Sequence, residues 1–391
     1  MTERIGGSDV GESETIAQKT DAGWVLSGTK WFTSATTSQM ALTLARPEGN
    51  PTGGAGLALF YVEPWDDQRL NNISILRLKD KFGTRKLPTA EVVLEQTPAE
   101  LVGSSHDGIK AISAMLNITR TWNAVCAISF MRRAIALARS YAHQRRAFGQ
   151  RLIDLPLHSL TLAKLQAEFE ASFHLTFFVV RELGLNEHQQ LSTERQLLLR
   201  LLIPICKLFT GKKVVEIASE ALECFGGAGY IEDTGISGIL KDAQVLPIWE
   251  GTTNILSLDM LRVVRDPQVQ SVWSKSLRRR LKRVEAPQLK NEVETVQQAI
   301  KQLKRWLKRA ADQSHQYWQF HARALAMSLA RTTAATLLLD QAHHDTDARN
   351  DPLSGIAARH FIDRGLVSLK QRNRDDDIEN ANCLSSEHFS K

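Results

Sequence analysis

Residues 108–135, GIKAISAMLNITRTWNAVCAISFMRRAI, contain the point at which the chain changes from strand to helix. Apolar residues recur there every three or four positions, as at Ile128, Met131 and Ile135, and residues that break helices are few. This spacing places the apolar side chains on one face of a helix, where they can pack against a core. The same pattern predicts further helices over 156–183, 191–225 and 254–264.

The chain before this point, residues 1–98, has the pattern of β-structure. Short apolar runs such as 56–62 alternate with turn clusters such as Ser27-Gly28 and 51–54. Helical periodicity is absent from this stretch, and short apolar runs bounded by turn residues are typical of strands. We therefore expect an α+β chain in which a β-domain precedes a helical part.

A third stretch begins after Asp266-Pro267 and is basic and amphipathic. Residues 275–309 contain twelve Lys or Arg against three Glu, a local net charge of +9, whereas the whole chain carries +6. This excess favours either a surface that binds a polyanion or the solvated face of a helix. We expect Trp273 and Trp306 to pack inward, and the polar tail over 371–391 to fray.

The composition is that of a globular protein. The chain has 391 residues, of which 43% are hydrophobic and 24% charged, enough for two or three domains that each have a core. Its four cysteines form no CxxC pair, and His343-His344-Asp345 lies in a polar stretch, so we predict neither disulfides nor a metal site. No run of 18 apolar residues indicates a membrane span, and we expect a cytoplasmic protein.

Four segments contain residue types suited to a nucleotide cofactor. Gly6-Gly7-Ser8 lets backbone N–H groups approach a phosphate, and Phe32 lies among hydroxyls where it can stack on a flat ring. Arg145 can grip a pyrophosphate, and Gly226-Gly227 permits a close backbone approach. Each segment also has an ordinary explanation: a glycine turn, a core aromatic residue, a helix cap and a plain loop. Taken alone, none of the four decides between these alternatives.

A candidate general base lies in Ile248-Trp249-Glu250-Gly251, just before a predicted helix. Apolar neighbours remove water from a carboxylate and favour its uptake of a proton, as a general base requires. The alternative is that a lone glutamate in a loop caps a helix or faces solvent.

In order and spacing, the chain resembles the acyl-CoA dehydrogenase family over residues 1–265. The matching segments are MTERIGGSDV, GTKWFTSA, KFGTRKLPTAEVV, NITR, QRRAFG, CFGGAGY and IWEGTTNIL. Their details, and a helical extension after the family's usual end, resemble the AidB-type (alkylation-response) branch. The resemblance implies an antiparallel β-barrel or sandwich domain over 1–98, an all-α FAD-binding bundle over 99–265 and a basic helical extension over 266–391.

The resemblance also implies a reaction. Glu250 would remove the α-proton of an acyl-CoA as a hydride passes from the β-carbon to FAD, with Arg120 at the substrate. The positions that match the family's FAD contacts are Thr2, Ser8, Phe32, Ser34, Arg145, Phe148, Gly226, Gly227, Thr252 and Asn254. The implied partners are an electron acceptor such as electron-transfer flavoprotein and further copies of the chain in a homotetramer. Because the match begins at the flavin-contact strand, we expect a chain without the family's N-terminal helical domain, which walls the acyl pocket.

The resemblance to the AidB-type branch suggests a second function, the binding of double-stranded DNA. Basic residues early in the extension would neutralise phosphates and give an affinity that falls with salt. These residues are Arg278, Arg279, Arg280, Lys282 and Arg283. The alternative is that they form a solvated helix face.

Overall fold

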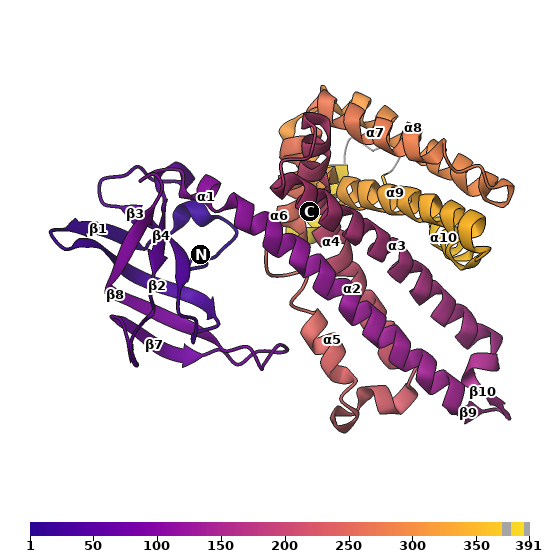
Figure 1. Ribbon diagram of the computed structural model, residues 1–391, viewed down its shortest axis with the longest axis horizontal. Coiled ribbons are helices and arrows are strands. Elements are labelled where there is room, and N and C mark those ends of the chain that lie inside the picture. The colour runs from indigo at the N-terminus through magenta and orange to yellow at the C-terminus, as the bar shows by residue number, and fades with distance from the viewer. Residues whose placement is uncertain (370–376, 387–391) are drawn as a thin grey trace. The chain divides into compact units, whose positions relative to one another are not determined.

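The computed structural model describes residues 1–369 and 377–386. The chain divides into two compact units, Met1–Thr119 and Arg120–Lys391 (Figure 1). The first contains the large sheet and the second is built of helices. The predicted α+β class, with a β-barrel-like domain and a helical bundle, is thereby confirmed. The division into three domains at residues 98 and 265 stays a prediction.

The first unit is a bent sheet whose ends meet. Its strand order is β2-β1-β3-β4-β8-β7, and a further ladder joins β2 to β8, so that five strands form a ring to which β7 is added. The ladders of this sheet are antiparallel except for that of β1 with β3. Two register shifts along β2 mark bulges, which bend a strand and allow a sheet to close. The strands are β1 (Ile16–Thr20), β2 (Gly23–Ser34), β3 (Ala41–Pro47), β4 (Ala58–Val62), β5 (Trp65–Asp66), β6 (Arg69–Leu70), β7 (Ile73–Leu78) and β8 (Thr89–Val102), and helix α1 (Gly108–Ala111) follows them.

The interior of this unit includes a buried ion pair beside its apolar core. Lys30 Nζ lies 2.6 Å from Glu3 Oε1, and both side chains are less than a tenth exposed. Glu3 also accepts a hydrogen bond from Thr15 Oγ1 at 2.7 Å. Burial by itself would raise the pKa of Glu3, but the charge of Lys30 and these hydrogen bonds lower it overall.

The helices of the second unit begin and end close to where their periodicity predicted. The three predicted over 156–183, 191–225 and 254–264 are α3 (Pro156–Glu187), α4 (Thr193–Glu223) and α6 (Thr253–Val264). Pro156 occupies the first turn of α3, where its missing N–H has no cost, and Ser192 caps α4 by accepting from the N–H of Arg195. The remaining elements of this part are α2 (Ser113–Gln144), α5 (Ser237–Ala243) and the short hairpin β9 (Arg146–Ala147) and β10 (Gln150–Arg151).

The extension continues the same bundle and shares its core. One cluster of buried side chains joins Leu202 and Phe209 of α4 to Trp273 and Phe361 of the extension. Trp273 and Trp306 are 1% and 3% exposed, which confirms that they pack inward. The helices of the extension are α7 (Pro267–Leu281), α8 (Lys290–Ala310), α9 (His315–Arg349) and α10 (Leu353–Asp363).

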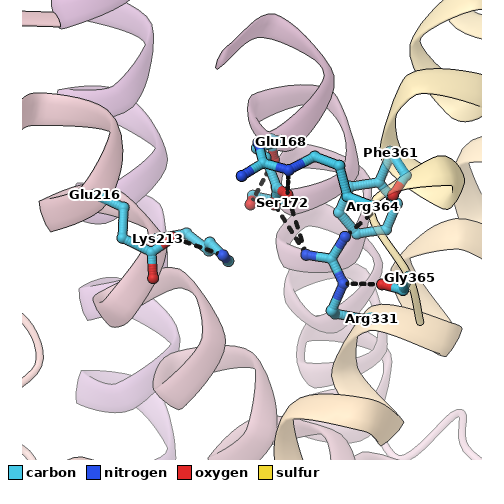
Figure 2. A network of polar contacts seen from close by, with 8 residues as sticks. All are labelled: Glu168, Ser172, Lys213, Glu216, Arg331, Phe361, Arg364 and Gly365. Atoms are coloured by element: carbon cyan, nitrogen blue, oxygen red, sulfur yellow. Dashed lines mark hydrogen bonds and ion pairs between the residues drawn. The ribbon is translucent and has the colours of Figure 1, made fainter. Parts of the chain in front are cut away.

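Arg331 of α9 fastens the extension to α3 (Figure 2). Its Nη1 lies 3.1 Å from Oε1 of Glu168, a carboxylate that is 3% exposed. Its Nε donates to the carbonyl of Gly365 at 2.7 Å, and its Nη2 donates to that of Phe361 at 3.1 Å. Arg364 approaches the same carboxylate at 3.6 Å. The buried charge of Glu168 is therefore neutralised by residues of the extension.

Part of the tail that was expected to fray forms a helix, α11 (Asp377–Ser386). Asp377 and Glu379 lie in its first turn, where negative charge interacts favourably with the helix N-terminus. The rest of that predicted stretch lies outside the described residues. In the part of the chain that the structure describes, no helix is long and apolar enough to cross a membrane.

Candidate active site

The β-unit places two of the predicted flavin contacts on the wall of a pocket of about 300 Å³. The ring of Phe32, on β2, is 57% exposed, which is unusual for a large aromatic side chain on a strand. Ser34 ends the same strand, and its Oγ lies 3.0 Å from Thr89 Oγ1 of β8. The pocket is lined mainly by β-strand residues, so that its shape is set by the barrel.

The N-terminal segment is tied to the same strand. The carbonyl of Thr2 accepts from the N–H of Trp31 at 2.9 Å, next to Phe32. A Cβ on Gly7 would lie 2.4 Å from Thr2 Oγ1, so only glycine fits beside that hydroxyl. Ser8 follows it and is exposed. The hydrogen bond therefore brings the backbone of Thr2 beside the strand that carries Phe32, and the roles of Thr2 and Ser8 at the flavin stay predictions.

In the helical unit, Arg145 and Phe148 lie at the hairpin of β9 and β10. Phe148 and Gly149 form its two-residue turn, with φ of +51° and +76°, the type that matches the twist of paired strands. This turn leaves Phe148 91% exposed. Arg145 precedes the hairpin and is exposed as well. The hairpin thus leaves the ring of Phe148 and the guanidinium of Arg145 exposed, where a ligand can contact them.

Gly226 and Gly227 lie on the surface after α4, in a 3-10 turn over Gly226–Tyr230. Gly226 has φ of +59°, which favours glycine, and a Cβ on either residue would meet no atom within 4 Å. A Cβ on Gly229, by contrast, would lie 2.0 Å from the carbonyl oxygen of Leu222. The two predicted glycines are therefore open to a ligand, whereas Gly229 is required by packing.

The candidate base lies in the connection between α5 and α6. Glu250 has φ of +59°, a left-handed conformation that non-glycine residues seldom adopt, and Gly251 follows with φ of +100°. Thr252 is the N-cap of α6 and accepts from the N–H of Ile255 at 3.5 Å. Asn254 is exposed in the first turn. The α6 cap thus fixes the end of the loop, and Glu250 lies two residues before it.

The two residues before Glu250 are only partly buried. Ile248 is 59% exposed and Trp249 is 38% exposed. The N–H groups of both residues donate to the carbonyl of Val245, so the segment is a tight turn. The removal of water from Glu250 by these two side chains stays a prediction.

A residue that the sequence analysis missed, Lys207 of α4, lies beneath this loop. Its Nζ donates to the carbonyl of Trp249 at 2.5 Å and to that of Gly251 at 2.6 Å. Burial lowers the pKa of Lys207 to about 7, in opposition to the nearby charge of Glu250. The sequence feature that could have identified Lys207 is its place as a single cation within the apolar run LLIPICKLF. A lysine in such a buried stretch is rare unless it has a defined partner.

Arg120, predicted to contact substrate, is held by protein groups in this structure. Its Nη1 lies 2.8 Å from Asp259 Oδ2, and its Nε donates to the carbonyl of Glu250 at 3.4 Å. Arg200 binds the other oxygen of Asp259 at 2.6 Å. Burial would raise the pKa of Asp259, but the two guanidinium groups lower it overall. Arg120 therefore contacts the backbone of the candidate base, and its contact with substrate stays a prediction.

The residues predicted to bind DNA are partly neutralised. Arg280 and Arg283 both pair with Asp340 of α9, at 2.6 and 2.9 Å. Arg280 also lies over the ring of Phe178, 4.7 Å from its centroid. The other three, Arg278, Arg279 and Lys282, are exposed. The single carboxylate of Asp340 therefore balances one of the five positive charges, and the side chain of Arg283 is still 59% exposed.

No group of three or more His, Cys, Asp or Glu that could hold a metal ion occurs among the described residues.

Three family models match the chain. They are the acyl-CoA dehydrogenase middle domain over residues 1–97, the acyl-CoA dehydrogenase C-terminal domain over 106–264 and the acyl-CoA dehydrogenase 11 C-terminal domain-like family over 268–388.

Two relatives show how far the similarity extends. Acyl-CoA dehydrogenase family member 11 of Caenorhabditis elegans is 43% identical over 383 residues, which are 95% of this chain and 62% of that protein. AidB of Escherichia coli (strain K12) is 36% identical over 267 residues, 68% of this chain and 47% of that protein. The chain therefore spans less than two thirds of the length of either curated relative. The greater similarity is to member 11, so the AidB-type branch is not singled out.

A solved structure agrees with these matches. The crystal structure of Caenorhabditis elegans ACDH-11 in complex with C11-CoA has a TM-score of 0.94 and 40% sequence identity. The match covers 100% of this chain and 68% of that chain, so it includes the extension as well as the barrel and the bundle.

Proposed function

The chain belongs to the acyl-CoA dehydrogenase family, and from this we propose that the protein is an FAD-dependent oxidoreductase that forms a double bond between the α- and β-carbons of an acyl-CoA. We assign the role of base to Glu250. The observation that supports this assignment is the loop itself, in which Glu250 is kept in a left-handed conformation with cations bound to the backbone on both sides.

The residues present fit the cofactor that the family uses. In the β-unit, the exposed ring of Phe32 and the hydroxyl of Ser34 lie on one pocket wall, as a flat ring with polar edges requires. In the helical unit, Gly226 and Gly227 leave the backbone open, and Arg145 offers a guanidinium for a pyrophosphate. When bound, FAD supplies the acceptor for the hydride that leaves the β-carbon.

The chemistry assigned to the chain is the removal of one proton. The α-C–H bond breaks, the proton passes to a carboxylate oxygen of Glu250, and the electron pair becomes part of the new double bond. Thr252 holds the start of α6, and Arg120 and Lys207 hold the loop, so the carboxylate is directed by groups that do not themselves react.

The substrate class and partners are extensions of this proposal. Because the solved relative has C11-CoA bound, we propose an acyl-CoA of medium or greater length as substrate. Electron-transfer flavoprotein is the proposed acceptor. Large exposed apolar side chains on the helical unit, such as Leu157 at 78% and Tyr230 at 89%, support the proposal of a homo-oligomer, for which the family suggests a tetramer.

The proposal is tested by comparing the purified protein with its Glu250→Gln variant. We expect flavin absorption in both, and turnover of a panel of acyl-CoAs with an artificial electron acceptor in the first. The amide cannot accept the proton, so the variant should be slower by about a hundredfold or more. Full turnover in the Glu250→Gln variant would show that Glu250 is not the base.

DNA binding and the AidB-type assignment are not part of the proposed function. Asp340 pairs with both Arg280 and Arg283 and balances one of their two charges, which weakens the electrostatic argument on which the DNA prediction depended. The prediction remains open to a direct measurement of retention on double-stranded DNA at two salt concentrations.

A further inference from the structure

We propose that Lys207 is the residue that positions the catalytic base, through its hydrogen bonds to the backbone on both sides of Glu250. The inference rests on the proposed function, in which Glu250 takes the α-proton. A catalytic group must be held within about 0.5 Å of its productive position by groups around it. Lys207 is a positioning residue, because its ammonium contacts the loop and acts on the reaction only through Glu250.

Three consecutive carbonyl oxygens accept hydrogen bonds from the side chains of Lys207 and Arg120. The Nζ of Lys207 donates to the carbonyls of Trp249 and Gly251, at 2.5 and 2.6 Å, and the Nε of Arg120 donates to the carbonyl of Glu250 at 3.4 Å. The peptide groups before and after residue 250 are therefore both fixed. Because the backbone sets the direction of the Cα–Cβ bond and restricts the rotamers, this arrangement also fixes the direction in which the Glu250 side chain starts from the loop.

The loop needs such a restraint because its conformation is unfavourable for glutamate. The φ of +59° at Glu250 brings Cβ close to the backbone, a strain that persists only where surrounding contacts compensate it. Lys207 supplies such contacts, because its Nζ donates one hydrogen bond to the carbonyl before Glu250 and one to the carbonyl of Gly251 after it.

Helix α4 is built to bring the lysine to this place. Gly211 lies one turn after Lys207, and a Cβ there would be 3.1 Å from the carbonyl oxygen of Leu246 and 3.3 Å from Cα of Pro247. The glycine therefore lets α4 touch the backbone at the start of the loop, and Lys207 binds its end. One helix face thus holds both parts of the loop.

Two other lysines are buried among the residues that the structure describes, and their partners differ from those of Lys207. Lys30 pairs with Glu3 at 2.6 Å, and Lys213 pairs with Glu216 at 2.6 Å on its own helix (Figure 2), so both make ordinary ion pairs. The hydrogen bonds of Lys207 go to backbone carbonyls that flank a candidate base. A lysine retained only for an ion pair would have a carboxylate in their place.

Amide hydrogen exchange of the full chain tests the contact without depending on catalysis. In Lys207→Met, we expect the amides of Ile248 and Trp249, which donate to the carbonyl of Val245, to exchange about ten to a hundred times faster than in the parent protein. Lys213→Met is the matched control, because it removes a buried lysine from the same helix two turns away. Exchange in the loop should be unchanged in this control.

Steady-state kinetics separates positioning from substrate binding. We expect kcat of Lys207→Met to fall by about ten to a hundredfold, since misplacing a reacting group by about 1 Å has an effect of this order, while KM stays within about twofold. Lys207→Arg retains charged donors and should recover part of both kcat and loop protection.

Two results would overturn the proposal: unchanged loop exchange in Lys207→Met, or faster exchange throughout the helical unit with no preference for the loop. If Lys207→Met does not fold, the same measurement is made on Lys207→Arg and Lys207→Gln. The loop amides should exchange more slowly in the parent protein than in Lys207→Arg, and more slowly in Lys207→Arg than in Lys207→Gln. Equal exchange rates in the three proteins would contradict the inference. Glu250→Gln serves as the separate test of the base: full activity in that variant removes the proposed function, whereas the exchange data still decide whether Lys207 holds the loop.

Discussion

Glu250 and Gly251 both have positive φ, and they tolerate it for different reasons. Gly251 has no Cβ and reaches φ of +100° without steric cost. Glu250 at φ of +59° has a Cβ, so its conformation depends on the contacts that Lys207 and Arg120 make with the backbone. Nine other non-glycine residues among those described also have positive φ, so the hydrogen bonds from Lys207 and Arg120, and not φ alone, distinguish Glu250.

The first prediction concerns this glycine. Gly251→Ala places a Cβ 3.1 Å from Leu256 Cδ2 and forces alanine to φ of +100°, so we expect a loss of about 1–3 kcal/mol in the free energy of unfolding. Urea denaturation measures it. Gly238→Ala, in α5 with no positive φ and no atom within 4 Å of the new Cβ, should leave stability unchanged or slightly higher. Equal effects of the two changes would contradict the role assigned to the turn.

The second prediction concerns pH. The pKa of Lys207 falls from its ordinary 10.5 to about 7 on folding, chiefly through burial. Between these values the unfolded chain holds more protons than the folded one at this residue, so its contribution to stability rises with pH from about 7 to 10.5. Lys207→Met removes this contribution. Unfolding curves of both proteins at pH 6, 8 and 10 should therefore show the parent gaining stability relative to the variant as pH rises.

At the scale of elements, helix α9 decides how the extension is attached. Its Arg331 neutralises Glu168 of α3, and its Asp340 pairs with Arg280 of α7 and Arg283 of the turn after it, balancing one of their two charges. The formal charge of a sequence stretch therefore overstates the charge that the surface presents. Part of the positive charge that the sequence assigns to a binding surface over 275–309 is therefore balanced within the protein.

The third prediction follows from the contact of α9 with α3. Arg331→Ala leaves Glu168 buried with a weaker partner, Arg364 at 3.6 Å, so we expect a loss of about 3–5 kcal/mol. Arg349→Ala on the same helix removes an exposed cation 3.8 Å from Asp345, whose carboxylate keeps its hydrogen bonds from Gln341 and Ser354, and should change stability by less than about 1 kcal/mol. Chemical denaturation followed by circular dichroism compares the two, and a similar small effect for both would show that the Arg331 contact is dispensable.

At the scale of the whole molecule, the two units have separate cores. The barrel core contains Phe60 and Val92, with Leu44 and Ile112 in a second cluster, whereas the bundle core joins α4 to the extension through Phe209 and Trp273. Units with their own cores can unfold as separate cooperative steps.

The fourth prediction uses this separation. Glu3→Gln leaves Lys30 charged and buried without its carboxylate, so we expect the barrel to lose about 3–5 kcal/mol. Calorimetry should show one transition shifted to lower temperature by Glu3→Gln and another shifted by Arg331→Ala. A single transition that moves equally in both variants would mean that the units unfold together.

Local pattern in the sequence determined the elements of this protein. Apolar spacing located α3, α4 and α6 to within a few residues and placed Trp273 and Trp306 inside, because periodicity depends only on near neighbours along the chain. The glycine after Glu250 likewise marked a turn before a helix.

Tertiary structure alone decided which groups surround the candidate base. Lys207 is 42 and 44 residues from the carbonyls it binds, and Arg280 is 60 residues from Asp340, so no local pattern could pair them. The shielding of Glu250 by Ile248 and Trp249 stays a prediction: these residues are 59% and 38% exposed, because exposure depends on how the turn is folded and not on adjacency in sequence. The sequence thus located the turn and its carboxylate, and packing between distant helices determined what holds them.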